Sequence, residues 1–237
     1  MRQLALDLQL ADYARLESFY PGPNAAVLEA VRDAARNAGQ QVHWIWGAAG
    51  SGRSHLLQAA VAEAGAAGTA CAWLPMASAE LVPGMLEGMG RLDLLCVDDV
   101  DQVAGDPAWE QALFVLFEEL RANAGRLLLS AAVPMQQAGF RLRDLASRLA
   151  SGPTWRLRPM EEDDCLQALQ LRAQWRGLEL PAEVGRFLLQ RTERSNKSLF
   201  ALLDKLDKEA LAAQRKLTVP FVRDVLERDS FAGRVRK

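Results

Sequence analysis

Residues 47–54 have the sequence G-A-A-G-S-G-R-S, which matches a phosphate-binding loop at every position but one. In the pattern G-x-x-x-x-G-K-[ST], backbone N–H groups at a helix N-terminus surround the phosphates of a nucleotide. Arg53 stands where the pattern has lysine. An arginine pairs with phosphate oxygens through a planar fork and does not fill the space of a lysine. The loop therefore predicts a site in which the nucleotide is held rather than consumed.

The segments on either side of this loop must place it at the end of a strand. Residues 42–46 are apolar and β-rich, which predicts a strand. The apolar positions after Ser54 predict a helix that ends near Gly65 and Gly68. A phosphate site requires this order of strand, glycine loop and helix. The alternative is an ordinary glycine-rich turn in a chain rich in alanine and glycine.

A second candidate feature is the apolar run from Leu92 that ends in Asp98 and Asp99. Buried parallel strands have such continuous apolar sequences, and their carboxyl ends meet at one edge of the sheet. Asp98 would then orient the water shell of a Mg²⁺ ion that Ser54 also binds, and Asp99 could polarise an attacking water. The alternative is a plain core strand followed by a polar turn.

Composition limits the classes of protein to which the chain can belong. It has 237 residues, of which 50% are apolar, enough for a main core and an accessory domain. Its net charge of −2 gives no basic field for nucleic-acid binding. Cys71, Cys96 and Cys165 lack metal-ligand spacing, so we expect reduced core cysteines in a cytoplasmic protein. We find no signal-peptide profile and expect no membrane contact.

The expected elements fall into two groups along the chain. Strands are expected at 42–46, 70–74, 92–99, 127–131 and 154–157, with helices at 78–88, 108–123 and 141–150 among them. This alternation predicts an α/β domain with a parallel five-stranded sheet. Helical periodicity alone follows, which predicts a small all-helical domain. We expect an extended tail over 1–14, the α/β domain over 15–159 and the helical domain over 160–237.

An α/β nucleotide domain followed by a small helical lid is the plan of the AAA+ ATPases, and the chain resembles their DnaA family. The resemblance extends over about residues 15–228. It is carried by F-Y-P-G-P-N at 19–24, S-H-L-L-Q-A at 54–59, D-L-A-S-R-L at 144–149 and R-S-N-K-S-L at 194–199. It implies an AAA+ P-loop fold with a lid, and bound ADP or ATP with Mg²⁺. The implied nucleotide contacts come from Tyr20, Pro21, Gly47, Gly50, Ser51, Gly52, Arg53, Ser54, His55, Asp98, Asp99 and Lys197.

The chain departs from the pattern of that family at three positions. Arg53 replaces the loop lysine, Ala132 stands where an acidic sensor is expected, and Lys197 replaces the lid arginine. Groups that act on the γ-phosphate and the attacking water affect catalysis more than binding. We therefore expect weak or absent hydrolysis at this site and a bound diphosphate, ADP.

Within the family the chain resembles the regulatory members more than the initiator. It ends soon after the lid, so we expect no DNA-reading module, and DNA contact only through the clamp. We also expect no helicase-loading domain at its N-terminus. Residues 3–8, Q-L-A-L-D-L, are similar to peptides that dock on the sliding clamp, the beta subunit of DNA polymerase III. Gln3 would enter a polar notch while Leu4, Leu6 and Leu8 face an apolar groove. The alternative is a first strand or a frayed end.

The resemblance also implies that Arg148 is an arginine finger that acts in trans on ATP bound to the DnaA initiator. Arg143 is a second candidate, and the alternative is a surface arginine paired with Asp144. The implied function is negative regulation of replication initiation from the clamp. The alternatives are a self-sufficient AAA+ ATPase or loader and a non-catalytic scaffold between clamp and DnaA. A homo-oligomer is also compatible with this family plan.

Overall fold

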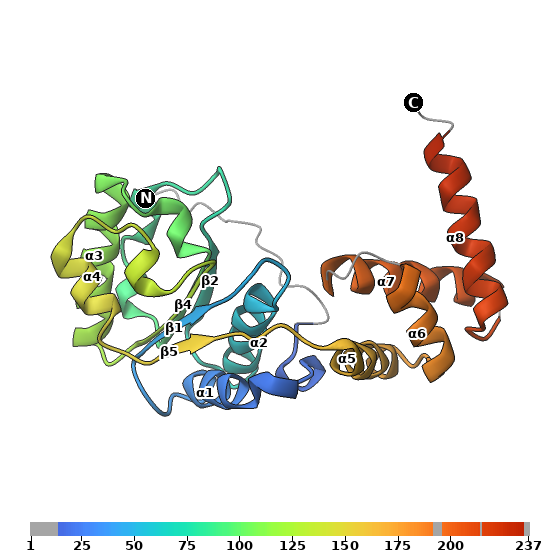
Figure 1. Ribbon diagram of the computed structural model, residues 1–237. Coiled ribbons are helices and arrows are strands. Elements are labelled where there is room, and N and C mark those ends of the chain that lie inside the picture. Colours follow the sequence, from blue (N-terminus) through green and yellow to red (C-terminus); the bar gives the residue numbers. More distant parts are fainter. Residues whose placement is uncertain (1–13, 192–195, 214, 235–237) are drawn as a thin grey trace. The chain divides into compact units, whose positions relative to one another are not determined.

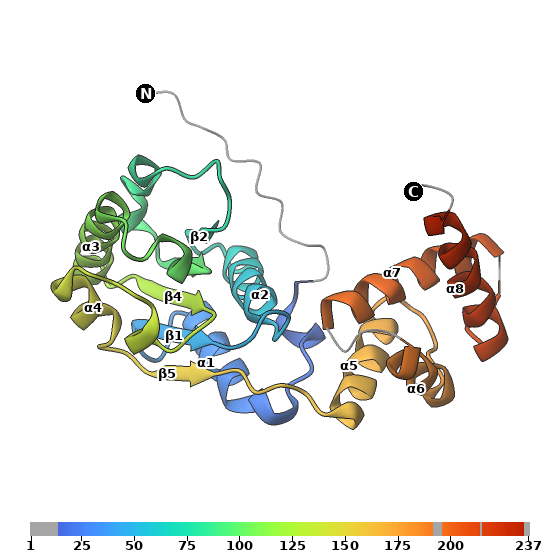
Figure 2. The same cartoon turned by 45° about the horizontal axis from the view of Figure 1, so that its top comes forward.

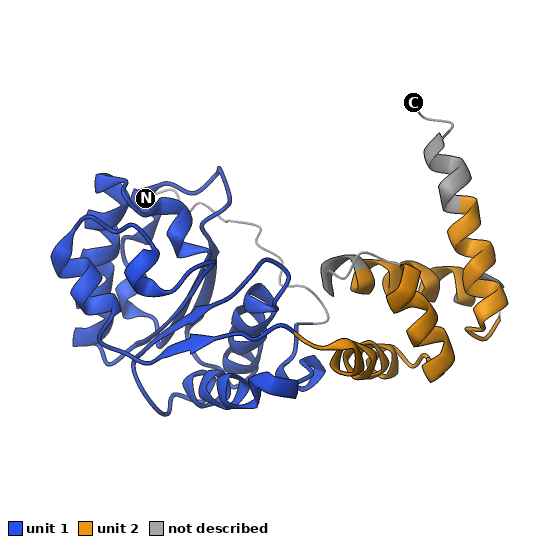
Figure 3. Cartoon of the chain, viewed as in Figure 1, with its two compact units in different colours: residues 1–159 blue, residues 160–237 orange. Residues whose placement is uncertain are grey.

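The computed structural model describes residues 14–191, 196–213 and 215–234. The chain divides into two compact units, residues 1–159 and 160–237 (Figure 3). We describe each unit by itself.

Unit 1 is built on the predicted parallel sheet of five strands, and the structure gives their order as β2-β3-β4-β1-β5 (Figure 1). The strands are β1 Val42–Trp46, β2 Cys71–Pro75, β3 Leu94–Asp98, β4 Arg126–Ala131 and β5 Thr154–Arg156. Since all pairs are parallel, the carboxyl ends lie at one edge, and the arrowheads of β4, β1 and β5 point the same way in Figure 2. This edge receives both the loop that follows β1 and the two aspartates at the end of β3.

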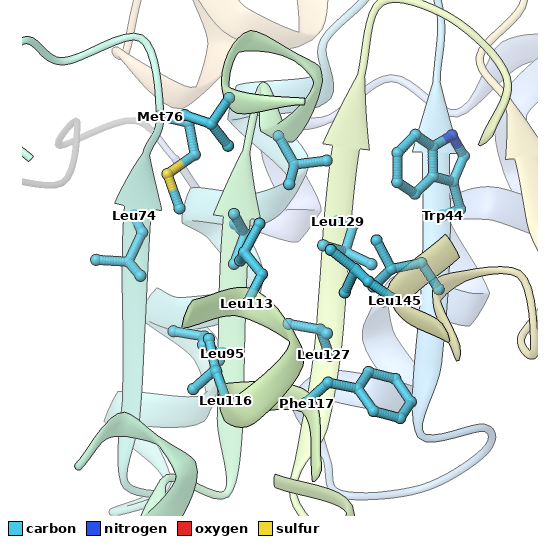
Figure 4. Packing of buried hydrophobic residues seen from close by; sticks show 14 of the residues in the cluster. Trp44, Leu74, Met76, Leu95, Leu113, Leu116, Phe117, Leu127, Leu129 and Leu145 are labelled. Atoms are coloured by element: carbon cyan, nitrogen blue, oxygen red, sulfur yellow. The ribbon is translucent and has the colours of Figure 1, made fainter. Parts of the chain in front are cut away.

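Helices cover both faces of this sheet, which explains the continuous apolar strands. One face packs against α1 Ala25–Ala35 and α2 Arg53–Ala66 through Ile45, Leu94, Cys96 and Leu128. The other packs against α3 Pro107–Ala122 and α4 Arg143–Leu149. Figure 4 shows this second cluster, in which the labelled strand residues Trp44, Leu95, Leu127 and Leu129 meet Leu113, Leu116, Phe117 and Leu145. Successive strand residues point to opposite faces, so both must be apolar.

The prediction of a helix at residues 78–88 is wrong. The segment forms short 3₁₀ turns instead, η3 Pro83–Leu86 and η4 Met89–Arg91. Pro83 lacks a backbone N–H, and Gly88 adopts a left-handed φ of 80° that ends helical continuation. Helix α1 was not among the expected elements. Its apolar residues at positions 27, 28, 31 and 34 have helical spacing that could have identified it.

Unit 2 consists of helices in the part that the structure describes: α5 Glu162–Trp175, α6 Ala182–Arg191, α7 Asn196–Ala213 and α8 Val219–Arg234. Their apolar stripes form one cluster that includes Leu169, Val184, Leu188, Leu203 and Val222. A capping box of Glu161 and Asp164 starts α5, and the Thr218 hydroxyl accepts the Phe221 N–H (3.4 Å) at the start of α8. The predicted small helical domain is confirmed. Within the described residues, no helix combines the length and apolarity needed to cross a membrane.

His43 on β1 should make the stability of unit 1 depend on pH. The buried ring accepts the Trp155 indole N–H at Nδ1 (3.1 Å), and its Nε2 lies 3.0 Å from the Gln40 carbonyl oxygen. This pairing fits the neutral tautomer, and burial lowers the pKa of His43 below its ordinary value of 6.5. The stability that the neutral ring provides is therefore present above about pH 6.5 and is lost as the pH falls below it.

Urea unfolding of the full chain at a series of pH values checks this prediction. Between about pH 7 and pH 5, the free energy of unfolding should fall more steeply for the wild type than for His43→Gln. Glutamine is uncharged over this range and can still donate and accept a hydrogen bond. Equal slopes for the two proteins would contradict the assignment.

Candidate functional site

The glycine-rich loop at residues 47–54 joins β1 to α2 and begins the helix at the edge of the sheet. Gly52 is the N-cap of α2 with φ 101°, and a Cβ there would lie 2.8 Å from the Phe19 ring. A Cβ at Gly47 would lie 3.0 Å from the Leu157 carbonyl oxygen. These two positions require glycine, because the loop closely approaches its neighbours. The predicted order of strand, loop and helix N-terminus is present, as an anion-binding site requires.

The side chain of Arg53, the first residue of α2, lies between this loop and the end of β3. Its guanidinium donates to the Gly47 carbonyl oxygen and to the Asp99 carboxylate, the latter at 2.6 Å. The two side chains are 11% and 29% exposed, so the ion pair is largely removed from water. The arginine thus connects the loop to the acidic end of β3. In this conformation Asp99 accepts from Arg53, and one of its oxygens is engaged by that bond.

Asp98 lies at the centre of a small hydroxyl cluster. Its carboxylate is 3% exposed and accepts hydrogen bonds from the Ser130 and Ser54 hydroxyls. Burial raises the pKa of Asp98 above its usual range, while the two serine bonds partly oppose that rise. The Ser130 oxygen also accepts the Asp99 N–H at 2.9 Å. The two residues predicted to bind Mg²⁺, Ser54 and Asp98, are therefore in contact.

These residues fit magnesium only as partial ligands. Serine and aspartate oxygens are the donors that Mg²⁺ prefers, and the ion usually keeps several waters and phosphate oxygens. Among the described residues, no group of three or more His, Cys, Asp or Glu side chains could hold a metal by itself. Ser54 and Asp98 therefore fit a Mg²⁺ ion that binds together with a nucleotide.

Asp101 belongs to the same edge and was missed in the sequence. Ala132 places only a methyl group where an acidic sensor was expected, but its N–H donates to Asp101 Oδ2 at 3.1 Å. Asp101 Oδ1 is buried without a hydrogen-bond partner in the described part of the chain. The Asp101 carboxylate, which belongs to the segment after β3, therefore lies at the end of β4. The signal that could have revealed it was a third acid three residues beyond Asp98.

The segment expected to cover the adenine side packs against the start of α2 and the end of β5. His55 Nε2 lies 3.2 Å from the Arg15 carbonyl oxygen, and the rings of His55 and Phe19 are 5.8 Å apart. The Asn24 amide donates to the Arg158 carbonyl oxygen (3.0 Å) and accepts the Arg158 N–H (2.7 Å). Tyr20 and Pro21, both half-buried, lie between these two points of attachment.

Arg148 lies on α4, and its partners are on α3 rather than in the loop. It donates through Nε to the Glu118 carboxylate, and its guanidinium lies 5.9 Å from the centre of the Phe114 ring. The alternative prediction, that Arg148 pairs with Asp144, is wrong, because its partner is Glu118. The side chain is 38% exposed. The structure therefore presents Arg148 partly exposed and paired with α3.

The side chains of five predicted site residues lie outside the described part of the chain. Gln3, Leu4, Leu6 and Leu8 lie outside the described residues. Lys197 belongs to α7 in unit 2, but its side chain is outside the described part.

The chain matches two family models. Residues 10–157 match the bacterial DnaA ATPase domain, and residues 162–226 match the model described as Hda, lid domain. Domain III of the replication initiation protein DnaA from Thermotoga maritima is similar in structure, with a TM-score of 0.77 and 21% identity over 92% of this chain and 98% of that one. AMPPCP-bound DnaA from Aquifex aeolicus gives 0.68 and 24% over 83% of this chain and 66% of that one.

These identities establish the shared fold, and the family models establish the relationship. The DnaA ATPase model covers most of unit 1, and the Hda lid model covers most of unit 2. The first of them alone matches more than half of the 237 residues. The chain therefore belongs to the DnaA family of AAA+ proteins, as a Hda-like member.

Proposed function

We propose that this chain is a nucleotide-holding regulator that, docked on the sliding clamp, stimulates hydrolysis of ATP bound to DnaA. The observation that carries the proposal is the ion pair between Arg53 and Asp99. It engages, within the chain's own site, the carboxylate that could polarise a water. The AMPPCP-bound DnaA of Aquifex aeolicus supports a nucleotide in a fold of this kind.

The bound nucleotide is proposed to be ADP, with ATP as the alternative. Loop N–H groups from Gly50 to Ser54 would surround its β-phosphate at the start of α2. Arg53 would exchange its bond to Asp99 for phosphate oxygens, with which a guanidinium forms two parallel bonds. Ser54 and Asp98 would hold Mg²⁺ through the nucleotide and water, and the ion when bound neutralises phosphate charge. Tyr20, Pro21 and His55 would cover the base.

We propose that Arg148 contributes to catalysis by contacting the γ-phosphate of ATP bound to DnaA. A guanidinium supplied in trans raises phosphoryl-transfer rates by about 10³- to 10⁵-fold. Glu118 holds Arg148 in a partly exposed ion pair, and such pairs are worth about 0–1 kcal/mol. A finger effect of about 4–7 kcal/mol is much larger. In the complex it would therefore be favourable for Arg148 to leave Glu118 and bind the γ-phosphate.

The proposed partners are DnaA and the beta subunit of the polymerase III clamp, with DNA reached only through the clamp. The proposed location is the cytoplasm, and a homo-oligomer is compatible with the family plan. Asp101 favours a second candidate function, a self-sufficient ATPase. Its Oδ1, which has no hydrogen-bond partner among the described residues, could orient water in place of the acid absent at Ala132.

Steady-state ATPase measurements separate these two functions. We expect slow turnover by the isolated chain and strong stimulation of DnaA-bound ATP hydrolysis when clamp and DNA are added. Robust turnover by the isolated chain would instead select the self-sufficient ATPase. Mass spectrometry of the nucleotide released from the purified protein then tests whether it holds ADP.

Clamp docking is proposed to use Gln3, Leu4, Leu6 and Leu8. The double variant Leu4→Ala with Leu6→Ala should weaken clamp binding at least about 30-fold, since each lost leucine side chain removes about 1–2 kcal/mol of apolar burial. Calorimetry with the isolated clamp measures this affinity. Asp7→Ala, on the opposite side of an extended peptide, is the matched control. Retained affinity in the double variant would show that another segment binds the clamp.

A further inference from the structure

Glu110 is a buried carboxylate near the start of α3 that the nucleotide site does not use. It is 2% exposed and accepts backbone N–H groups from two separate segments. Gly105 donates at 2.7 Å, Leu142 at 2.6 Å, and Arg141 to both oxygens at 2.9 and 3.1 Å. Burial would raise the pKa of Glu110, but the bonds from these N–H groups outweigh it and lower the pKa. The carboxylate is thus held in its ionised form.

These bonds fix the beginning of α4, which lacks a side-chain cap of its own. The helix has seven residues, and its N-cap residue Leu142 makes no side-chain cap bond. A helix this short is marginal without tertiary contacts. Leu145 and Leu149 anchor it in the core, and Glu110 accepts the N–H groups that precede its first turn. The core therefore holds the apolar face of α4, and Glu110 connects the beginning of the helix to α3.

Helix α3 supplies the contacts at both ends of α4. Glu118, eight residues after Glu110 and about 12 Å further along the helix, pairs with Arg148. Between these ends, Leu145 packs with Leu113 and Phe117 in the cluster shown in Figure 4. Two carboxylates on one rigid helix therefore determine where α4 begins and where its arginine lies.

Glu110 also connects α4 to the segment that leaves the nucleotide site. That segment starts at Asp99, whose backbone is left-handed (φ 54°), and runs through η5 Val100–Val103 to Gly105. Its Asp101 accepts the Ala132 N–H at the end of β4. A Cβ at Gly105 would lie 3.7 Å from Arg141 Nε, so the two segments are neighbours. One carboxylate therefore joins the acidic end of β3 to the helix that carries Arg148.

We propose that Glu110 is a positioning residue for Arg148. By fixing the start of α4, its carboxylate sets the direction in which the guanidinium is offered to the γ-phosphate of DnaA-bound ATP. This inference rests on the proposed function of Arg148. It predicts an effect on the maximal rate of stimulated hydrolysis and little effect on the affinity for DnaA, because Glu110 is buried and cannot contact the partner.

Glu110→Gln tests the proposal in the full chain, with Glu119→Gln, an exposed carboxylate on the same helix, as the matched control. Glutamine has one acceptor oxygen, and its amide N–H groups would face the donors of Arg141 and Leu142. We expect amide hydrogen exchange over residues 141–149 to be about tenfold faster or more, with the sheet still protected. The maximal rate of DnaA-ATP hydrolysis should fall about tenfold or more at an unchanged half-saturating concentration.

The same substitution in an Arg148→Ala background separates positioning from general destabilisation. If Glu110 acts through Arg148, its replacement has no further effect on hydrolysis in that background. An equal fall with and without Arg148, or unchanged exchange over 141–149, overturns the proposal. If Arg148→Ala alone leaves hydrolysis intact, the proposed function fails, and the exchange data still decide whether Glu110 positions α4. Glu110→Asp, one methylene shorter, replaces the glutamine variant if that one fails to fold.

Discussion

Replacement of Arg148 by alanine is expected to slow hydrolysis of DnaA-bound ATP by about 10³-fold or more in the presence of clamp and DNA. The lost guanidinium would otherwise stabilise charge that develops on the γ-phosphate, an effect of about 4 kcal/mol. The fold should persist, because the ion pair with Glu118 is partly exposed and worth about 0–1 kcal/mol. Single-turnover conversion of DnaA-bound ATP to ADP measures the rate.

Two further variants make this result specific to the finger. Arg143→Ala removes an exposed arginine at the start of the same helix and should leave the rate nearly unchanged. Arg148→Lys keeps the charge without the planar fork and should restore only part of the rate. If Arg148→Ala supports hydrolysis as well as the wild type does, the chain acts as a scaffold. Loss of rate in Arg143→Ala alone would move the finger to that residue.

Replacement of Arg53 by alanine is expected to weaken ADP binding by about 30- to 1,000-fold. Truncation of one partner of a largely desolvated charge pair costs about 2–4 kcal/mol, and the proposed partner in the complex is the β-phosphate. Arg36→Ala is the matched control, because it breaks an exposed ion pair with Glu63. Glu63 lies on helix α2, which begins at Arg53. Calorimetry with nucleotide-free protein measures both affinities.

Asp99→Asn distinguishes a phosphate ligand from a structural ion pair. If Arg53 binds phosphate, removal of the competing Asp99 charge should leave ADP binding unchanged or tighter. If the ion pair matters only because it holds the loop in shape, Asp99→Asn and Arg53→Ala should weaken binding to a similar degree. That second pattern would contradict a role for Arg53 in nucleotide retention.

Much of the fold could be predicted because its strands are buried on both faces. β1 coincides with the predicted segment 42–46, and β4 begins one residue before the predicted 127–131. The order of the strands in the sheet does not follow from such patterns, since pairing joins segments far apart in sequence. Residues 78–88 misled the prediction, since proline and glycine override local apolar spacing there.

The candidate site was predictable in its residue types but not in its pairings. A loop motif and two aspartates mark the nucleotide edge, yet the bond from Arg53 to Asp99 joins residues 46 apart. Arg148 meets Glu118 across 30 residues, where helical spacing pointed to Asp144. Glu110 carries no local signal at all, because its three N–H partners are supplied by loops. Such contacts depend on tertiary packing, which residue spacing does not encode.

The central claim is that the ATP consumed lies on DnaA and not on this chain. Loading DnaA with radiolabelled ATP and this chain with unlabelled nucleotide, then the reverse, locates the hydrolysis in a single turnover with clamp and DNA. The account predicts rapid formation of labelled ADP only when the label starts on DnaA, and its loss in Arg148→Ala. Rapid formation of labelled ADP when the label starts on this chain would contradict it.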